Sequence, residues 1–261
     1  MTGSASADLG QGIRWQVCRL PTVASTNEWL LDEASKGAAA GTVALAAHQS
    51  AGRGRRGRRW DSPPGASLLA SVLLRPIAPP DELFAVTAAV GLAAADACAL
   101  VAGVAPGIKW PNDLVVWDRK LAGILAESDA AAPGGREGSV AVVVGIGCNV
   151  HWGDAPGATC LAMHTDRQVS PDALLDALLD RLAPRVPGLD AGEGRRATVA
   201  ELRQRCVTLG RAVRVERDGA SPLEGTARTL DDEGHLLVED VRGDVVSVAV
   251  GDVVHLRPLT A

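Results

Sequence analysis

The sequence predicts an α+β protein, with a main domain that mixes helices and strands and a small C-terminal domain of short strands. Strand-like apolar runs alternate with helical patterns up to residue 207, and short strands with polar turns follow Gly210. The chain has 261 residues, 47% of them hydrophobic, enough for one sizeable core and a small extra domain. We expect a flexible N-terminus over 1–12, a main domain over 13–207 and a C-terminal domain over 208–261.

The main domain begins with a strand, a capped helix and two further strands. Residues 17–20 form the first strand, and the helix after it starts at Ser25, whose hydroxyl can cap it, with Glu28 in the first turn. Two apolar runs, 42–47 and 67–74, then predict strands on either side of a polar loop.

In the rest of the main domain, predicted helices and strands follow one another. Apolar residues at helical spacing over 81–101 predict a long buried helix, and Pro111 and Asp118 mark turns between short strands. A leucine stripe follows Ser170 and Pro171, which start another helix. The strands expected here are 107–110, 114–117, 120–127 and 140–146, and the helices are 81–101, one that begins at 170, and 197–207.

The C-terminal domain has a different sequence pattern, in which short strands are separated by tight polar turns. A strand spacing of ~8–12 residues predicts a small barrel. A domain of about 50 residues is near the lower limit for independent folding, so we expect it to dock on the main domain. The strands expected here are 213–216, 224–230, 235–239, 245–250 and 253–256.

The composition argues against several classes of protein. A net charge of -5 and a pI near 5.6 disfavour a protein that coats nucleic acid or membrane surfaces. The five cysteines are odd in number and form no Cys-x-x-Cys pair, which predicts reduced thiols rather than disulfides or a zinc site. We find no secretion signal and no uninterrupted apolar stretch of the ~20 residues that span a bilayer. We therefore expect a cytoplasmic protein without a membrane partner.

The segment 52–60, here named the arginine loop, holds five arginines in nine positions. These like charges repel one another and the interleaved glycines leave the backbone without a preferred shape, so an anion would stabilise the loop. The pattern also fits a localisation-type basic run, an RNA-binding patch or a solvated loop. Glycine N–H groups can reach an anion and Trp60 offers a flat face to a purine, which together favour a nucleotide.

Two segments with lysines follow. Lys109 opens a Lys-Trp-Pro-Asn-Asp-Leu segment, which taken alone is a turn with a solvated cation. Lys120 begins an apolar strand and is followed by Gly123, which permits close backbone approach. A buried lysine needs an anionic partner, and a carboxylate or phosphate substrate would provide one.

Two other segments have an ordinary and a functional interpretation. Asn149 follows a Gly-Ile-Gly run at the end of an apolar strand. It belongs either to a strand-to-loop turn or to a site where its amide bonds a base or sugar edge. Ser25, Thr26 and Asn27, taken alone, are only a helix cap.

Together these segments resemble the biotin protein ligases. The matching segments occur in the family's order and are Ser25-Thr26-Asn27, Gln49 with 52–60, 109–114 with 120–127, and 145–150. Residues 251–257 resemble the last strand of the family's SH3-like C-terminal domain. The resemblance implies a class II synthetase-like catalytic domain, with a central mixed β-sheet flanked by helices, and an SH3-like β-barrel. It also implies ATP-dependent ligation of biotin to a lysine of a biotin carboxyl carrier domain through biotinyl-5′-AMP, with Mg²⁺ accompanying ATP.

The resemblance also implies roles for particular residues. Lys120 would hold the biotin carboxyl oxygen and stabilise negative charge in both steps, and Arg55 is the second catalytic candidate. The residues expected to bind biotin and its neighbouring groups are Ser25, Thr26, Asn27, Gln49, Gly52, Arg53, Gly54, Arg55 and Lys120. The residues expected at the nucleotide are Arg53, Arg58, Trp60, Asn112 and Asn149. No metal ligand is assigned.

Two alternatives remain open. Lipoate ligases and octanoyl transferases share the fold, but this chain lacks an Arg-Arg-x-Ser-Gly-Gly-Gly segment. An RNA-binding module would use the arginine loop, although the acidic net charge argues against it. Only 24 residues precede Ser25, too few for the helix-turn-helix domain of the family's bifunctional members, so we expect no DNA binding. The oligomeric state stays open.

Overall fold

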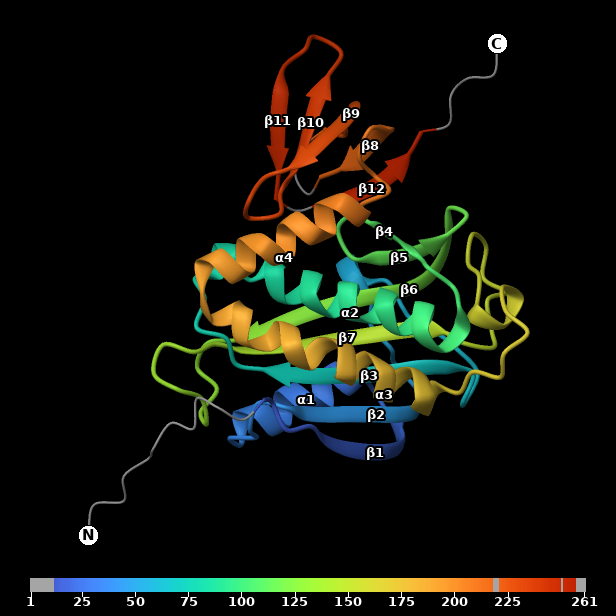
Figure 1. Cartoon of the computed structure of the whole chain (residues 1–261), viewed down its shortest axis with the longest axis vertical. Helices are drawn as coiled ribbons and strands as arrows, with labels where there is room; N and C mark the ends of the chain where they lie inside the picture. Colours follow the sequence, from blue (N-terminus) through green and yellow to red (C-terminus); the bar gives the residue numbers. More distant parts are fainter. Residues whose placement is uncertain (1–11, 218–220, 250, 257–261) are drawn as a thin grey trace.

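The computed structural model describes residues 12–217, 221–249 and 251–256. A seven-stranded mixed sheet lies in the middle of the main domain, and a five-stranded antiparallel sheet lies at the C-terminal end (Figure 1). The α+β class and the central mixed sheet flanked by helices are confirmed. We expected a flexible terminus over 1–12, and residues 1–11 of that segment lie outside the described part. The expected boundary at 207 falls between the last helix and the second sheet, and as a domain boundary it stays a prediction.

The main sheet has the strand order β1-β2-β3-β7-β6-β5-β4. β1 pairs with β2 in parallel and every other neighbouring pair is antiparallel. The middle strands β3 and β7 are almost entirely buried, as their continuous apolar runs predict. The strands are β1 (Gln16–Val23), β2 (Thr42–Gln49), β3 (Ser67–Leu74), β4 (Gly107–Lys109), β5 (Asp113–Val116), β6 (Arg119–Asp129) and β7 (Ala141–Asn149).

Helices cover both faces of this sheet (Figure 1). Leu73 and Val143 belong to the cluster beneath α1, whereas Val72 and Val144 belong to the larger core with α2 and α3. Successive side chains of a strand point to opposite faces, so α1 lies on one face and the other helices lie on the opposite one. The helices are α1 (Thr26–Ser35), α2 (Phe84–Ala102), α3 (Pro171–Leu182) and α4 (Gly192–Arg205).

Helix α2 is apolar around most of its circumference because most of it is buried. By length and composition alone, the segment Pro80–Ala102 could cross a membrane, with a mean hydropathy of 2.0. However, 67% of its most apolar window is buried inside the fold, as expected for a core helix. The helix predicted over 81–101 divides into a 3₁₀ turn, Pro80–Glu82, followed by α2.

Helix α4 begins at Gly192, earlier than the predicted start at 197. Gly192 and Gly194 have low helix propensity, which points to a later start. Tertiary contacts override that preference. Arg195 in the first turn is buried, donates to the Leu189 carbonyl at 2.8 Å and pairs with Glu82 at 2.5 Å.

The second sheet has the order β11-β10-β9-β8-β12 and is antiparallel throughout. The prediction of a closed barrel is wrong for the described residues, since β11 and β12 are edges and no ladder joins them. Closure requires edge strands that pair with each other, and each of these has only four residues. The predicted strand 245–250 ends on a residue outside the described part. The strands are β8 (Ala212–Glu216), β9 (Leu223–Leu230), β10 (Leu236–Asp240), β11 (Val245–Val248) and β12 (Asp252–His255).

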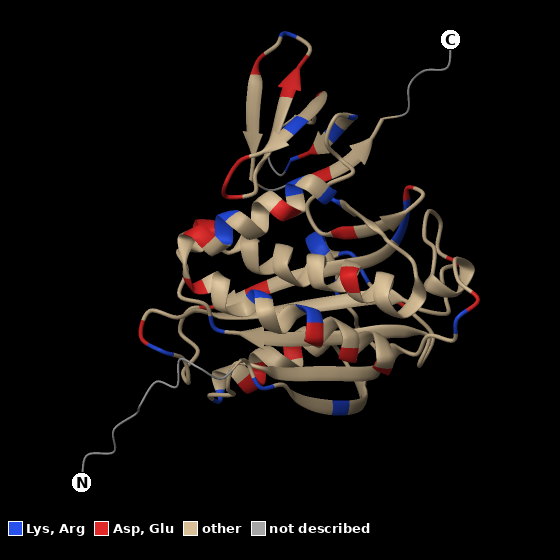
Figure 2. Ribbon diagram, in the orientation of Figure 1, with Lys and Arg blue, Asp and Glu red and all other residues tan. Residues whose placement is uncertain are grey.

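Buried contacts fix the C-terminal sheet to the main domain. Trp110, directly after β4, is 1% exposed, and its Nε1 donates to the Gly234 carbonyl at 2.9 Å. Its backbone N–H donates to Thr208 Oγ1 at 3.1 Å. A Cβ at Gly234 would lie 2.0 Å from the Phe84 ring, so the turn packs tightly against the start of α2. Figure 2 shows acidic and basic residues interspersed over both parts of the molecule.

A histidine lies at the same junction. His255 Nε2 is 3.2 Å from Thr208 Oγ1, and its Nδ1 is 3.1 Å from Arg211 Nη1 and 3.8 Å from Asp118 Oδ1. Burial, with the nearby cations of Lys109 and Arg211, lowers the pKa of His255 to about 4. Because the unfolded chain has the ordinary histidine pKa of about 6.5, it binds a proton that the folded protein does not.

The free energy of unfolding should therefore fall as the pH drops from about 6.5 towards 4. Urea unfolding at several pH values measures this loss, and we expect it to be smaller in His255→Gln than in the wild-type protein. Identical pH dependence in His255→Gln and wild type would contradict the prediction.

Candidate active site

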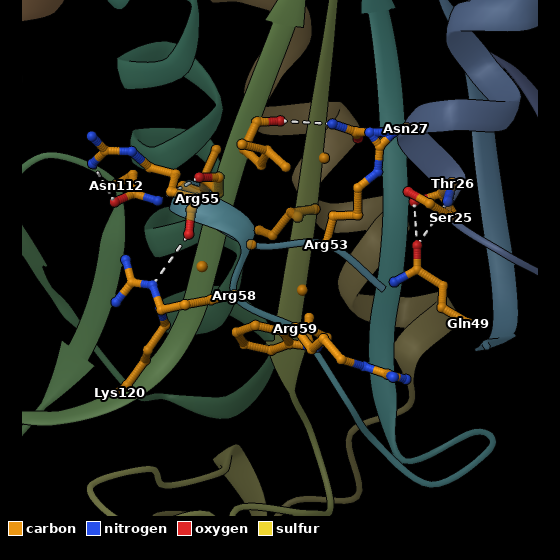
Figure 3. A pocket seen from close by; sticks show the side chains of 18 residues that line it. Ser25, Thr26, Asn27, Gln49, Arg53, Arg55, Arg58, Arg59, Asn112 and Lys120 are labelled. Atoms are coloured by element: carbon orange, nitrogen blue, oxygen red, sulfur yellow. Dashed lines mark hydrogen bonds between the residues drawn. The ribbon is translucent and has the colours of Figure 1, made fainter. Parts of the chain in front are cut away.

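A cavity of about 110 Å³ lies on the face of the main sheet that carries α1 (Figure 3). β6 and β7 line one side, the first turn of α1 and the end of β2 line another, and the arginine loop lines a third. Val143 packs against α1, so by strand alternation Gly145 and Gly147 face the same side. Their partners across the ladder are Leu125 and Gly123.

Glycines at these positions allow other groups to approach the sheet. A Cβ at Gly147 would lie 2.4 Å from the Trp60 ring, and one at Gly123 would lie 3.1 Å from it. A Cβ at Gly145 would lie 2.2 Å from Asn27 Oδ1. The sequence showed these glycines within its motifs, and it indicated close backbone approach only for Gly123. Their shared function, a recess that admits Trp60 and Asn27, became visible only in the register of β6 against β7.

A buried polar network forms one end of the cavity. Ser25 caps α1, and Thr26 donates to Gln49 Oε1 from its backbone N–H at 2.7 Å and from its hydroxyl at 3.0 Å. Asn27 Nδ2 donates to the Leu125 carbonyl at 3.1 Å and to Glu127 Oε2 at 2.8 Å. The predicted residues Ser25, Thr26, Asn27 and Gln49 thus all line the cavity.

Two members of this network were missed by the sequence analysis. Ser71 is 0% exposed, and its hydroxyl lies 2.7 Å from Thr26 Oγ1 and 2.6 Å from Asn27 Oδ1. Glu127 joins the network to the arginine loop through Arg53, at 3.3 Å. For Ser71 the sequence does contain a signal, because its hydroxyl stands in the middle of the apolar run 67–74 and a buried hydroxyl requires a polar partner.

Lys120 lies at the opposite end of the cavity. Its Nζ is 2.7 Å from Asp113 Oδ1 and 5.7 Å from the centre of the Trp60 ring, and its side chain is 35% exposed. From the sequence we expected a substrate carboxylate or phosphate as the anionic partner of this lysine, whereas in the structure the partner is the Asp113 carboxylate. Two hydrogen bonds to the segment 157–159 hold the backbone of Lys120. Its N–H donates to the Gly157 carbonyl, and its carbonyl accepts from the Thr159 N–H.

The arginine loop folds back on itself beside the cavity. Gly54 N–H donates to the Arg58 carbonyl at 2.7 Å, and Trp60 N–H donates to the Gly52 carbonyl at 2.9 Å. The turn between them contains Arg56 with φ of 55° and a left-handed glycine after it. Carboxylates of the protein offset part of the expected repulsion between the arginines. Arg53 pairs with Glu127, and Arg56 and Arg58 pair with Asp252 of the C-terminal sheet.

Arg55 is the most enclosed arginine in this loop, with a side chain that is 17% exposed. It donates to Asn112 Oδ1 at 3.2 Å, and Asn112 Nδ2 in turn donates to the Ile124 carbonyl at 2.6 Å. Burial lowers the pKa of the Arg55 guanidinium, an effect opposed by Asp252 and Asp113. A desolvated cation at the edge of a cavity gains stability from an added anion.

Two predicted residues lie away from the cavity surface. Asn149 is buried, its Nδ2 donates to the Thr159 carbonyl at 3.0 Å, and it does not line the cavity. Gly52 acts within the loop, where a Cβ would lie 2.3 Å from the Trp60 carbonyl oxygen. Nucleotide binding by Asn149 and substrate binding by Gly52 stay predictions. The others, including Arg53, Gly54, Arg58 and Trp60, line the cavity.

The described residues contain no group of three or more His, Cys, Asp or Glu side chains placed to hold a metal ion. These residues therefore assign no protein ligand to a metal ion.

Comparison with known proteins defines the class of this fold and site. The Biotin/lipoate A/B protein ligase family matches residues 20–149, and the Biotin protein ligase C terminal domain matches residues 208–256. A biotin–[acetyl-CoA-carboxylase] ligase from Mycobacterium tuberculosis is 38% identical over 258 residues, which cover 95% of this chain and 92% of that protein. The chain belongs to the biotin protein ligase family.

Two further relatives show how far the similarity extends. The bifunctional ligase/repressor BirA of Escherichia coli is 38% identical over 148 residues, which cover 56% of this chain and 44% of that protein. The structure of the biotin protein ligase from Aquifex aeolicus in complex with biotin and ATP aligns with a TM-score of 0.75 at 25% identity. That alignment covers 93% of this chain and 99% of the other. The resemblance indicated by the sequence motifs is thus confirmed.

Proposed function

We propose that the protein joins biotin to a lysine of a biotin carboxyl carrier domain in two steps, the first of which consumes ATP. In the first, the biotin carboxylate attacks the α-phosphorus of ATP, which gives biotinyl-5′-AMP and releases pyrophosphate. In the second, the carrier lysine amine attacks the acyl carbon, which forms an amide and releases AMP. The observation that carries the proposal is one cavity in which the buried polar network, Trp60, Lys120 and the arginine loop meet. The solved relative with biotin and ATP supports it.

The polar network suits the neutral ureido ring of biotin. Gln49 Oε1 already accepts two hydrogen bonds from Thr26, so Nε2 is the group of Gln49 that would donate to the ureido oxygen. Ser25 and Asn27 lie beside it on the same helix turn. Ser25 and Asn27 are buried, Gln49 is held by Thr26, and Asn27 is held by the Leu125 carbonyl and Glu127. These groups are therefore oriented before the substrate arrives, which reduces the entropy lost on binding.

The cationic end suits the two anions of the first step. A carboxylate and a phosphate in contact repel each other by about 4 kcal/mol at an effective dielectric constant of about 20, and fixed cations relieve this repulsion. Lys120 lies where the carboxyl oxygen would bind, and Asp113 holds its ammonium group in place until the substrate takes over. Arg55, held by Asn112, lines the same cavity and would pair with the phosphate.

The second step reuses the same cations. When the amine attacks, negative charge develops first on the acyl oxygen and then on the departing AMP, and Lys120 and Arg55 stabilise both. The arginine loop shields the mixed anhydride from water, which would otherwise hydrolyse it. The five cysteines are free thiols, which supports a reducing compartment such as the cytoplasm.

Mass spectrometry of a carrier domain tests the proposal directly. With biotin, Mg-ATP and this protein, we expect the mass of the carrier to increase by one biotinyl group, located on one lysine. No mass increase, or an equal increase with lipoate in place of biotin, would overturn it.

Pyrophosphate release with each acid separates the alternatives. A lipoate or octanoate ligase of the same fold would release pyrophosphate with those acids and not with biotin. An RNA-binding module would release none and would bind RNA with strong salt dependence. The named relatives favour biotin, and the net charge of -5 argues against a protein whose main role is RNA binding.

A further inference from the structure

Asp252, the first residue of β12, places its carboxylate against the arginine loop of the main domain. Oδ1 lies 2.9 Å from Arg58 Nη2 and 4.0 Å from Arg55 Nη1, and Oδ2 lies 3.6 Å from Arg56 Nη1. One carboxylate of the C-terminal sheet therefore meets three of the five loop arginines. The side chain of Asp252 is only 24% exposed, so water screens these interactions less than at an open surface.

The position of Asp252 is fixed by the sheet around it. Asp252 pairs with Glu216 at the end of β8, and the Glu216 carbonyl also accepts a hydrogen bond from Arg56 at 3.3 Å. A Cβ at the preceding Gly251 would lie 2.6 Å from a Val215 methyl carbon, so the chain lies tightly against β8. Since Trp110 fixes this sheet to the main domain, the sheet holds the Asp252 carboxylate beside a glycine-rich loop.

Asp252 does not line the cavity, which is formed entirely by residues of the main domain. Its carboxylate reaches the cavity through the loop, because Arg55 and Arg58, which it contacts, both line the cavity. Without this charge, the three arginines would repel one another, and the glycines would allow the loop many other conformations.

We propose that Asp252 is a positioning residue that keeps the arginine loop closed over the cavity, so that the C-terminal sheet controls access to the active site. The placement of the loop follows from the structure alone. The consequence for the reaction rests on the proposed function, because only then does the closed loop retain an adenylate.

Amide hydrogen exchange in residues 52–60 of the full-length protein tests the placement without any substrate. Asp252→Asn keeps the shape of the side chain and removes its charge, and we expect exchange about fivefold faster, as for the loss of roughly 1 kcal/mol. Asp252→Glu keeps the charge and should remain within about twofold of wild type. Asp244→Asn removes a carboxylate from an exposed turn of the same sheet and should have no effect on the loop.

A double-mutant cycle separates a specific contact from general damage. If the carboxylate acts through Arg58, Asp252→Asn should accelerate exchange much less in an Arg58→Gln background than in the wild-type background. Equal acceleration in both backgrounds, wild-type exchange in Asp252→Asn, or equal acceleration by Asp244→Asn would overturn the proposal. If Asp252→Asn destabilises the whole chain, exchange in β3 and β7 will rise in parallel with the loop, which also overturns it.

The second measurement is the rate at which biotinyl-5′-AMP leaves the enzyme. We expect Asp252→Asn to release it about fivefold faster than wild type, with Asp252→Glu close to wild type. If the wild-type protein forms no adenylate, the proposed function fails while the hydrogen-exchange result still decides the role of Asp252. If adenylate forms and leaves both proteins at the same rate, the loop does not depend on Asp252 in the complex, and the proposal fails.

Discussion

Replacing Lys120 with alanine should slow adenylate formation and weaken biotin binding by about one to two orders of magnitude. A hydrogen bond to a charged group contributes roughly 1.5–3 kcal/mol, and the substituted enzyme would lose that contact with the substrate carboxylate. The Asp113 carboxylate would also remain at the site without its cation, 2.7 Å from where Lys120 Nζ had been, and would repel the incoming anion. Pyrophosphate release and calorimetric titration with biotin measure the two effects.

The neighbouring Arg119 supplies a matched control for this prediction. It is exposed and adjacent to Lys120 on β6, so Arg119→Ala removes the same charge from the opposite face of the strand. Arg119→Ala should retain wild-type rates, and Lys120→Arg should recover part of the lost activity. Wild-type kinetics in Lys120→Ala would show that the lysine is only a solvated strand end.

The sequence was most informative where function requires a specific residue type. Lys120 was identified because a lysine at the start of an apolar strand needs an anionic partner, and Trp60 because its ring offers a flat face to a purine. Asn112 was implied only by the resemblance to the family, and all three line the cavity. Asp252 and Ser71 were missed because their importance depends on neighbours more than 40 positions away in the chain. Only the folded protein brings such residues together, so no local pattern indicated their partners.

The same distinction applies to the fold. The strands of the main sheet and helix α2 follow from hydrophobic periodicity, and their predicted bounds differ from the observed ones by a few residues. The start of α4 was predicted too late, because buried contacts of Arg195 stabilise a turn whose glycines disfavour a helix. Barrel closure was wrong for the described residues, because pairing between β11 and β12 depends on three-dimensional strand geometry rather than on strand spacing.

Replacing Gly147 with alanine should weaken nucleotide binding, because the added methyl group would displace Trp60. The new Cβ would lie 2.4 Å from the Trp60 ring, which lines the cavity, so the ring would have to shift away from β7. Overpacking of this kind typically destabilises by 1–3 kcal/mol, which corresponds to about one to two orders of magnitude in affinity if it falls on the bound state. Calorimetric titration with Mg-ATP in the presence of biotin measures it.

Two further variants show whether the effect passes through Trp60. Gly12→Ala adds the same methyl group where no atom lies within 4 Å of the new Cβ, and it should leave binding unchanged. Trp60→Leu alone should also weaken binding, because it removes the flat face offered to the base. Adding Gly147→Ala to Trp60→Leu should then have little further effect, since the smaller side chain leaves room for the methyl group. Additive losses in the double variant would mean that Gly147 acts on the site by a route other than Trp60.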